Sequence, residues 1–449
     1  ATALSAPLML HASREPVPME LEATRTTAAA VLSKALLLDI LLGAAANAVN
    51  QADRNIMPIA VIPMAEAYGW NMMQRGFILS SFAYGYMLTQ LPGGLFATKL
   101  PPLKLLLVAV SCWSLATMLT PAAADIGIRT AFACRVVLGM AEGFCLPAIF
   151  QLFAGRVPEA LRSRAFSFML GAGSVGQLAA LLVCPQLTPW PTMFSLFGGV
   201  GLCWAALCLL RMCLSSSLRD DDRGRAVPQP GESVEASDED DGASLSSDML
   251  PHRQPWPHGA LAAICLAHLA QNWTNYTLSA WLPTYLHEEL GMPTQQLSLT
   301  ALPFAVNACA NVGFGLLADS ATASGWSLLS VRRAATLTGL LGPAVCHLLF
   351  TLTASPGMAI ALVTLSFFLG AATAPGYMAN HADLSSSYAG LTFAIANTIA
   401  TIPGLVAPPF TAWLVEATGS WAAVFVLAAL INVAGSFAYA TLSDARRVL

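Results

Sequence analysis

Twelve stretches of about 20 mostly apolar residues, separated by proline, glycine or charged residues, run through this chain of 449 residues. A stretch of that length crosses the roughly 30 Å hydrocarbon core of a bilayer as an α-helix. Lipid restricts the backbone to helices or closed barrels, and the alternating segments of a barrel do not occur in this sequence. The sequence therefore predicts an all-α integral membrane protein with twelve transmembrane helices. We expect them near residues 36–65, 75–97, 103–123, 129–154, 163–184, 192–214, 258–284, 296–318, 333–354, 357–378, 388–413 and 420–442.

The composition agrees with a membrane protein, since 56% of the residues are hydrophobic and 10% are charged, against roughly 25% charged in soluble domains. The net charge of −4 reflects one acidic segment, Asp220 to Asp248, which holds ten of the 25 carboxylates. No nucleic-acid partner is expected. The ten cysteines are scattered in apolar stretches without metal-ligand spacing, so we expect no disulfide framework, no metal site and no cofactor.

Lysine and arginine predict the orientation in the membrane. If the N-terminus is cytosolic, seventeen of the 21 basic residues fall on the cytosolic side. Arg75 and Arg129 fall on the opposite side, and Arg54 and Arg135 lie at membrane depth. The positive-inside rule then places both termini in the cytosol, or on the equivalent side of an organelle membrane.

The chain divides into two halves. Residues 215–257 are rich in serine, proline and acidic residues and cannot bury enough apolar surface to fold. Features recur in order at offsets of 220 to 231 residues, such as Ile62-Pro63 and Leu282-Pro283. Six plus six helices with a parallel repeat resemble the major facilitator superfamily, in which substrate binds between the halves. We expect a disordered N-terminal segment, a first six-helix half, a disordered acidic linker, a second six-helix half and a tail, at residues 1–34, 35–214, 215–257, 258–442 and 443–449.

Arg135 and Glu142 lie seven residues apart in the fourth predicted helix. Seven residues are nearly two turns, so both side chains leave the same face. An ionised side chain in the bilayer costs at least about 2.5 kcal/mol, and such residues usually mark a substrate or ion path. The two residues are therefore candidates for anion binding and for ion coupling. A structural ion pair between helices is the alternative.

Asp53 and Arg54 form a second charged position, in the first predicted helix. Neighbouring residues on a helix point about 100° apart, so Asp53 is not expected to neutralise Arg54. The planar guanidinium fork suits phosphate or carboxylate. We therefore predict that Arg54 and Arg135 bind an anion and that Glu142 carries a coupling proton, with Asp53 as a second coupling carboxylate. An interhelical anchor is the alternative for Arg54.

Other polar residues in the apolar background give further candidates. Gln271, Asn272 and Tyr276 of the seventh helix suit hydrogen bonding to a small polar substrate, or contacts between helices. His381 and Asp383, in the loop between helices ten and eleven, are candidates for ion coupling, with an exposed polar loop as the alternative. The dinucleotide pattern G-x-G-x-x-G at 171–176 is inside the fifth helix, where Gly173, Gly176 and Ala180 are expected to permit close helix packing.

Several of these residues stand in motifs that resemble the anion transporter family of sialin, the vesicular glutamate transporters and the plant plastid phosphate transporters. The second half is most similar to the plant and algal phosphate branch. The motifs are Asp53-Arg54, Ser81-Phe82-Ala83-Tyr84-Gly85-Tyr86, Thr89-Gln90-Leu91-Pro92-Gly93-Gly94, Arg135 with Glu142-Gly143 and Pro147-Ala148, Arg162-Ser163-Arg164, Trp281-Leu282-Pro283-Thr284-Tyr285, Val331-Arg332-Arg333, Asn380-His381 with Asp383, and Tyr388-Ala389-Gly390.

The resemblance implies sodium- or proton-coupled symport of an anion, inorganic phosphate first, by a monomer in a plastid envelope or thylakoid membrane, or in a plasma or other organelle membrane. An organic anion such as ascorbate, glutamate or a sugar acid is the alternative substrate, and a non-transporting receptor is the alternative class. No catalytic constellation points to an enzyme. The implied substrate contacts include Tyr84, and the implied gating residues are Arg162, Arg164, Asp319, Arg332 and Arg333.

The sequence departs from the family pattern in two places. Leu79 and Gln271 replace a histidine and an arginine of the vesicular glutamate transporters, which argues against glutamate-type recognition. After the second helix, Pro101-Pro102 replaces the usual pair of glycines and Thr98 stands at the usual acidic or serine position. The cytosolic gating contact there is therefore expected to differ, while Asp319 keeps the acidic position in the second half, where it is expected near Arg332 or Arg333.

Overall fold

The computed structural model describes residues 19–157, 159–225, 258–384 and 389–445, and no strand occurs in these ranges. The all-α prediction is confirmed. The predictions for residues 1–18 and 226–257 fall outside the described residues. The first half contains α1 (Met19–Tyr68), α2 (Met72–Lys99), α3 (Pro102–Ile126), α4 (Ile128–Glu142), α5 (Cys145–Arg156), α6 (Glu159–Val183) and α7 (Pro191–Arg225). The second half contains α8 (His258–Thr284), α9 (Ala301–Ala323), α10 (Leu328–Phe350), α11 (Pro356–Gly370), α12 (Ala379–Leu384), α13 (Ala389–Thr418) and α14 (Ala422–Leu442).

Nine segments of the described chain are long and apolar enough to cross a bilayer. Helices α1, α2 and α8 have 50, 28 and 27 residues, so they are also long enough, but they carry more polar side chains. With these three, the described helices are consistent with the twelve predicted crossings. The polar character of α1, α2 and α8 is the first structural indication that these helices do more than contact lipid.

Two helices extend beyond their predicted ends. Helix α1 begins at Met19, inside the segment predicted to be disordered, and α7 continues to Arg225, inside the predicted linker. The sequence explains both extensions, since residues 28–30 are all alanine, the best helix former, and Asp221 precedes Arg225 by four residues. Local helix preference therefore continues past the apolar stretches from which the boundaries were predicted.

The fourth helix of each half is broken. Helix α4 ends at Glu142, and α5 begins after Gly143 and Phe144. Pro147 has no N–H to donate to the carbonyl of Gly143, which accounts for the break. In the second half, α11 ends at Gly370 and is followed by a 3-10 turn and a π-turn that contains Pro375. The two breaks occupy matching places in the repeat.

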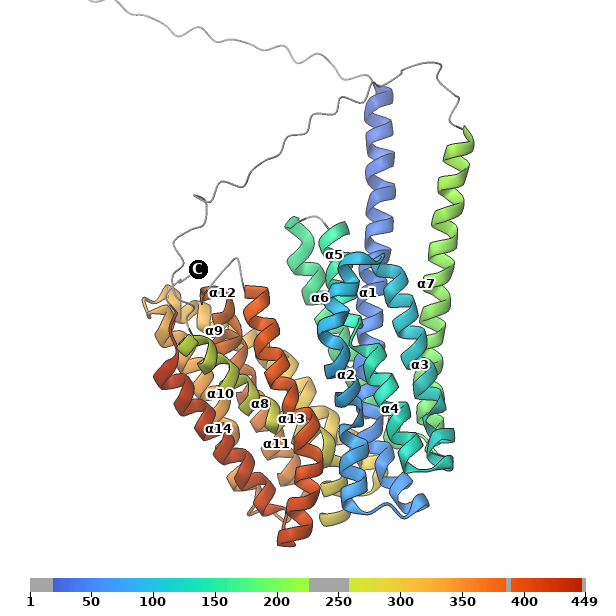
Figure 1. Cartoon of the computed structure of the whole chain (residues 1–449). Helices are drawn as coiled ribbons and strands as arrows, with labels where there is room; N and C mark the ends of the chain where they lie inside the picture. Colours follow the sequence, from blue (N-terminus) through green and yellow to red (C-terminus); the bar gives the residue numbers. More distant parts are fainter. Residues whose placement is uncertain (1–18, 158, 226–257, 385–388, 446–449) are drawn as a thin grey trace, which may run out of the picture.

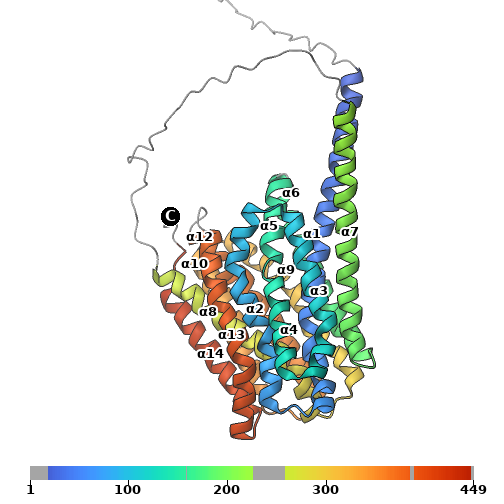
Figure 2. The ribbon, with the colours of Figure 1, turned by 45° about the vertical axis from the view of Figure 1, so that its right-hand side comes forward.

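The halves lie side by side, and their ribbons diverge toward the end of the molecule that carries the start of α1 and the end of α14 (Figure 1). The long α1 and α7 run next to each other in both views (Figure 2). Contacts between halves join α2 to α13 and α6 to α9.

Polar contacts close the halves at the opposite end. Arg75 of α2 forms an ion pair with Glu288, which follows α8. Nearby, the Gln186 amide donates hydrogen bonds to the carbonyl of Gln295 at 2.8 Å and to Ser298 Oγ at 2.9 Å. The two halves are therefore fastened to each other at the end away from the start of α1.

Candidate functional site

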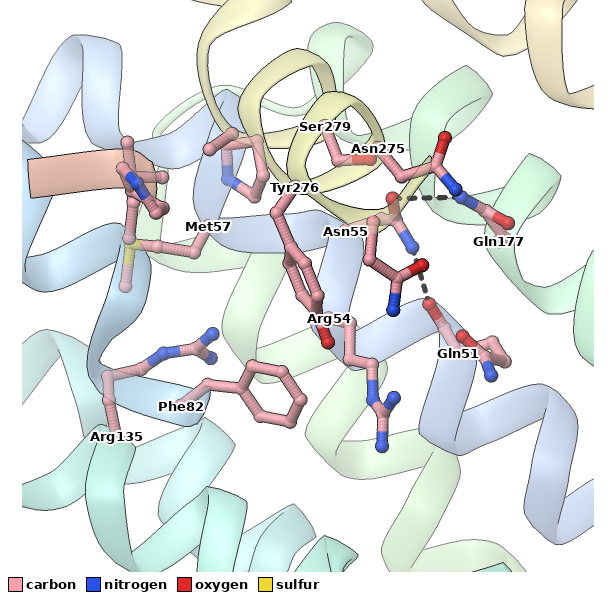
Figure 3. A pocket seen from close by; sticks show the side chains of 15 residues that line it. Gln51, Arg54, Asn55, Met57, Phe82, Arg135, Gln177, Asn275, Tyr276 and Ser279 are labelled. Carbon is pink, nitrogen blue, oxygen red and sulfur yellow. Dashed lines mark hydrogen bonds between the residues drawn. The ribbon is translucent and has the colours of Figure 1, made fainter. Parts of the chain in front are cut away.

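A cavity of about 210 Å³ lies between the two halves. Figure 3 shows its side chains converging from both halves, and in this view the guanidinium groups of Arg54 and Arg135 lie on either side of the Phe82 ring. Most of the lining comes from α1, α2 and α8, the three helices whose polar residues set them apart. The lining residues are Gln51, Arg54, Asn55, Met57, Pro58, Leu79, Phe82, Arg135, Gln177, Asn272, Asn275, Tyr276, Ser279, Ala280 and Pro408.

Helices α1 and α8 line the cavity through matching positions of the repeat. Helix α1 contributes residues 51, 54, 55 and 58, which follow the i, i+3, i+4, i+7 spacing of one helix face. Helix α8 contributes residues 272, 275, 276 and 279, at the same spacing and at a constant offset of 221 residues. Equivalent positions of the two halves therefore face each other across the cavity. In this correspondence, Arg54 of the first half matches Asn275 of the second.

Arg54 is ion-paired with Glu142. The guanidinium Nε donates to Glu142 Oε2 at 2.8 Å, which joins α1 to the end of α4. The Arg54 guanidinium also lies 4.6 Å from the ring centres of both Phe82 and Tyr86. Cation–π contacts of this kind stabilise a partly desolvated arginine. The interhelical ion pair considered as an alternative is therefore present, but the partner of Glu142 is Arg54 rather than Arg135.

Arg135, the second arginine of the cavity, forms no ion pair with any described residue. It lines the cavity from α4, and its residue is 2% exposed. No described residue accepts a hydrogen bond from its Nε or Nη1 atoms. A buried guanidinium without acceptors is costly, so a group that supplies acceptors inside the cavity would be bound strongly. Arg135 can therefore grip an anion that enters between the halves.

Asp53 does not line the cavity. It is fully buried, and Thr117 and Trp113 of α3 lie within interaction range of its carboxyl group. No described residue donates a hydrogen bond to either carboxyl oxygen. As predicted from the helical angle, Asp53 is not the partner of Arg54. Instead it lies behind the cavity wall, close enough to interact electrostatically with both Arg135 and Glu142.

The predicted substrate contacts divide into two groups. Asn272 and Tyr276 line the cavity, and the Asn272 amide is held by a 2.8 Å hydrogen bond to the Ala400 carbonyl. Gln271 faces a second, smaller cavity instead. Tyr84 packs against Phe132 of α4, with ring centres 5.7 Å apart, and does not line the cavity. In this structure Tyr84 therefore makes no contact with the cavity, because its position on α2 turns it toward α4, and its role as a substrate contact stays a prediction.

The sequence interpretation missed several lining residues. Gln51, Asn55, Gln177, Asn275 and Ser279 contribute amides and a hydroxyl to the cavity. The Gln177 amide donates to Asn55 Oδ1 at 3.3 Å across α6 and α1. Four of these five residues, Gln51, Asn55, Asn275 and Ser279, lie on the same helix faces as Arg54 on α1 and Asn272 on α8. The i, i+3, i+4, i+7 spacing could therefore have predicted them.

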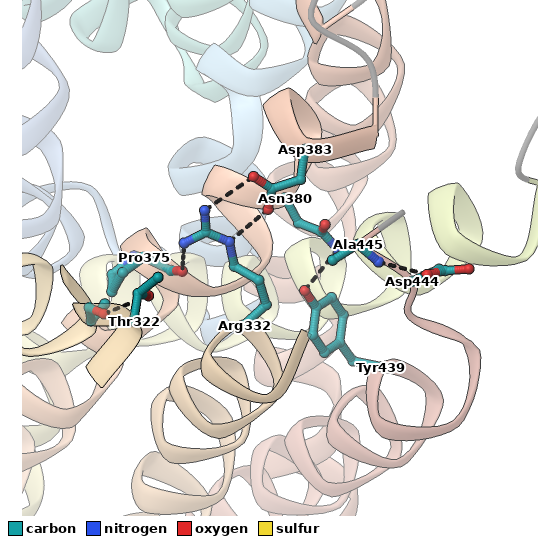
Figure 4. A network of polar contacts seen from close by, with 9 residues as sticks. Thr322, Arg332, Pro375, Asn380, Asp383, Tyr439, Asp444 and Ala445 are labelled. Carbon is teal, nitrogen blue, oxygen red and sulfur yellow. Dashed lines mark hydrogen bonds and ion pairs between the residues drawn. The ribbon is translucent and has the colours of Figure 1, made fainter. Parts of the chain in front are cut away.

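His381 and Asp383 are remote from the cavity. His381 is 3% exposed in α12 and its Nδ1 lies 3.1 Å from Thr392 Oγ1, so the exposed loop considered as an alternative is wrong. Asp383 forms a two-point ion pair with Arg332, at 2.6 and 3.1 Å, and Arg332 also donates to the Pro375 carbonyl at 2.8 Å (Figure 4). This pair ties α12 and the broken tenth helix to α10.

The remaining gating candidates are distributed around the ends of the helices. Arg333 donates to Ser443 Oγ and to the Ser443 carbonyl, both at 2.9 Å, and so joins α10 to the chain after α14. Asp319 is exposed near the end of α9 and forms no ion pair with any described residue, so the expected contact with Arg332 or Arg333 is not formed. Arg162 and Arg164 lie in the first turns of α6, and their side chains fall outside the described part of the structure.

Two glycines of the G-x-G-x-x-G pattern, Gly173 and Gly176, pack against α1. A Cβ on Gly176 would lie 1.9 Å from the Ala48 carbonyl oxygen, and one on Gly173 would lie 2.5 Å from the Asn47 amide. Ala180 is fully buried. The interpretation as a helix contact is therefore confirmed.

The chain matches the family model of the Major Facilitator Superfamily over residues 43–326. It is 31% identical over 409 residues to "Probable anion transporter 4, chloroplastic" of Oryza sativa subsp. japonica, covering 88% of this chain and 66% of that protein. It is 33% identical over 388 residues to human sialin, covering 82% and 75% of the two chains. It is 30% identical over 402 residues to "Sodium-dependent phosphate transport protein 1, chloroplastic" of Arabidopsis thaliana, covering 88% and 77%.

Among solved structures, a bacterial homologue of the human lysosomal transporter Spinster, in an inward-facing and occupied conformation, resembles this fold. The TM-score is 0.70 at 15% sequence identity, over 89% of this chain and 95% of that one. At this identity the likeness concerns the fold alone. The arrangement of the helices is therefore that of a known architecture.

Proposed function

The chain belongs to the Major Facilitator Superfamily, and from that premise we propose that it carries a small anion, inorganic phosphate first, across its membrane by alternating access. The relatives sialin and the chloroplastic anion transporters confirm the resemblance predicted from the motifs. They are transporters by name, which agrees with the expectation that the chain is not an enzyme.

Arg135 is the observation that carries this proposal. Its guanidinium is buried in a cavity between the halves, and two of its donor nitrogens, Nε and Nη1, have no acceptor among the described residues. A phosphate or carboxylate would supply acceptors in the planar geometry that the fork prefers. Because the cavity is bounded by both halves, an anion held there could be exposed to either side when the halves rock around it.

Glu142 would couple this movement to a cation. Its carboxylate neutralises Arg54 through the 2.8 Å ion pair. In this state Arg135 is therefore the cavity arginine without an ion-pair partner among the described residues. Protonation of Glu142 would release Arg54 as a second anion ligand. Binding of the proton and binding of the anion would then favour each other, which is the energetic requirement of symport. A sodium ion beside Glu142 would act in the same direction, and Asp53 would tune the charge from behind.

An organic anion is the second candidate substrate. Sialin and the "Ascorbate transporter, chloroplastic" of Arabidopsis thaliana, 30% identical over 405 residues, are relatives whose names indicate organic acids. The second half lines the cavity with amides, hydroxyls and a tyrosine, and without any charged side chain. Such a wall suits the uncharged part of a larger anion.

For the cellular setting we propose a plastid envelope membrane, since the names of three of these relatives carry the word chloroplastic. The proposal also includes a monomer with both termini on the cytosolic-equivalent side. The start of α1 and the end of α14 lie at the same end of the molecule, which supports the proposed even number of crossings (Figure 1).

Uptake into proteoliposomes tests the function. The purified full chain is expected to accumulate labelled phosphate under an inward proton or sodium gradient, and Arg135→Ala is expected to abolish the accumulation. A panel of organic anions under the same gradients decides between the two substrate classes. If no anion accumulates under any proton, sodium or voltage gradient, the proposed transport function is wrong.

A further inference from the structure

A second cavity of about 70 Å³ lies inside the second half, bounded by α8, α9, α10, α11 and α14. Asn275 lines this cavity and the central cavity alike, so the two spaces adjoin at that side chain. A volume of this size has room for a few groups the size of water. The function proposed above makes no use of it.

The position of this cavity in the repeat is informative. At the offset of 221 residues, Gln271, Thr274 and Asn275 correspond to Asn50, Asp53 and Arg54. Gly370 ends α11 as Glu142 ends α4, and both helices have 15 residues. Asp53, Arg54 and Glu142 thus have uncharged counterparts in the second half. These counterparts, Thr274, Asn275 and Gly370, line the second cavity.

The walls of the cavity are built from amides and hydroxyls in fixed positions. Gln271 accepts a hydrogen bond from the Tyr377 hydroxyl at 2.5 Å. The Asn307 amide donates to the Phe367 carbonyl at 2.7 Å, and Ser366 Oγ lies 3.3 Å from His347 Nε2. These contacts hold the polar groups in place before any ligand arrives, which lowers the entropic cost of binding one.

Two side chains retain hydrogen-bonding capacity. The Asn432 amide donates to Thr274 Oγ1 at 3.0 Å, but its Oδ1 atom has no partner in the described structure, and the residue is 1% exposed. The Asn275 amide is available between the two cavities. A buried amide oxygen without a donor is unfavourable, and a hydroxyl group of a ligand would satisfy it.

We infer that this second cavity is a subsite for the uncharged, hydroxylated part of an organic anion whose acidic group is bound at Arg135. The inference rests on the proposed function and names a substrate class for the same site. The charged residues lie in the first half and their neutral counterparts lie in the second. A hydroxylated carboxylate can therefore pair its acidic group with Arg135 and its hydroxyls with the amides of the second half. A ligand with an apolar tail would leave the amides of Asn275 and Asn432 unsatisfied.

Binding of three probe anions to the purified full chain tests this subsite by isothermal titration calorimetry. Gluconate and hexanoate have the same charge and the same number of carbons, and only gluconate carries hydroxyls; inorganic phosphate has no tail. We expect gluconate to bind at least about tenfold more tightly than hexanoate, since each satisfied hydrogen bond is worth a factor of a few.

Two variants then locate the effect. Asn432→Leu and Asn275→Ala are each expected to reduce the advantage of gluconate over hexanoate to about threefold or less. Asn432 does not line the central cavity, so in Asn432→Leu the Kd for phosphate should also stay within about twofold. Asn275 has no hydrogen bond to lose among the described residues, so its variant remains informative if Asn432→Leu is unstable. Thr364→Val is the control, because the Thr364 hydroxyl bonds to the Ile360 carbonyl of its own helix at 2.7 Å and lines neither cavity.

The outcomes separate this inference from the proposed function. If gluconate has no advantage over hexanoate, or if the advantage survives both variants, the cavity holds only structural water and the inference is wrong. Phosphate binding that is weakened at least about tenfold in Arg135→Ala would still support the transporter in that case. If none of the three anions binds to the wild-type chain, the proposed function itself is contradicted.

Discussion

Arg54 and Glu142 form an ion pair between α1 and α4, with Nε 2.8 Å from Oε2, while two guanidinium nitrogens of Arg135 on the same α4 have no acceptor among the described residues. The two arginines of the cavity therefore differ in kind. Arg54 is neutralised by the Glu142 carboxylate and lies against two aromatic rings, whereas Arg135 is available to a ligand. This asymmetry gives each side chain a distinct expected phenotype.

Glu142→Gln is expected to abolish uptake driven by a proton gradient while sparing part of the anion exchange. The amide cannot take up a proton, and it leaves Arg54 permanently without its counter-charge. Uptake under a gradient and counterflow without one are measured in the same proteoliposomes. Glu66→Gln, at an exposed position near the end of α1, is the control and should behave like the wild type. Unchanged gradient-driven uptake in Glu142→Gln would contradict the coupling role.

Arg135→Ala is expected to weaken anion binding by about tenfold to a hundredfold, because charge-assisted hydrogen bonds contribute roughly 1.5–3 kcal/mol. Arg135→Lys should be intermediate, since it keeps the charge and loses the planar fork. Titration of the purified protein with phosphate measures both. If both variants bind phosphate like the wild type, Arg135 is not the anion ligand.

Asp383→Asn tests whether Asp383 stabilises the structure through Arg332 or takes part in ion coupling. Asp383 pairs with Arg332 at 2.6 Å and does not line the central cavity, so its loss should lower the thermal midpoint and slow transport. The response of the remaining uptake to pH should stay that of the wild type, because the variant leaves Glu142 intact. Initial rates across a pH series measure this. A pH profile that becomes flat in Asp383→Asn would restore the coupling role that the sequence suggested.

The fold could be predicted from the sequence because apolar length and the distribution of lysine and arginine both reflect the bilayer. The helix ends were less predictable, since α1 begins at Met19 and α7 continues to Arg225, both beyond the apolar stretches from which the boundaries were predicted. Positions 36–65 and 258–284 were found despite their polar residues, and those same residues proved to line the cavity.

The site was predicted in part. Arg54, Arg135 and Glu142 stood out because charge at membrane depth is costly. The partner of Glu142 could not be predicted, because helical spacing relates residues of one helix and leaves the distances between helices unknown. The same limit applies to His381, whose burial in α12 depends on contacts with α13. Asn275 could have been found from the constant offset between α1 and α8.

The ion pair of Arg75 with Glu288 is expected to stabilise the state in which the halves meet at the end away from the start of α1. A partly exposed pair contributes about 0.2–1 kcal/mol. Arg75→Ala or Glu288→Ala should therefore shift the population toward the opposite state by a factor of about 1.4 to 5. Spin labels at the exposed positions Ala67 and Ala417 report the separation of the two halves. Exchanging the charges, Arg75→Glu with Glu288→Arg, should restore the wild-type distance distribution, and unaltered distances in both single variants would contradict this assignment.

Gly176 and Gly171 provide a matched test of packing within one motif. A Cβ on Gly176 would lie 1.9 Å from the Ala48 carbonyl oxygen, whereas a Cβ on Gly171 would meet nothing within 4 Å. Gly176→Ala is therefore expected to force α6 away from α1 and to cost about 1–3 kcal/mol of stability. Gly171→Ala should be neutral or slightly stabilising, because alanine favours the helix by about 0.5–1 kcal/mol. Thermal unfolding of the two purified variants, followed by tryptophan fluorescence, measures the difference. Equal midpoints would mean that the close approach of α6 to α1 is not required for stability.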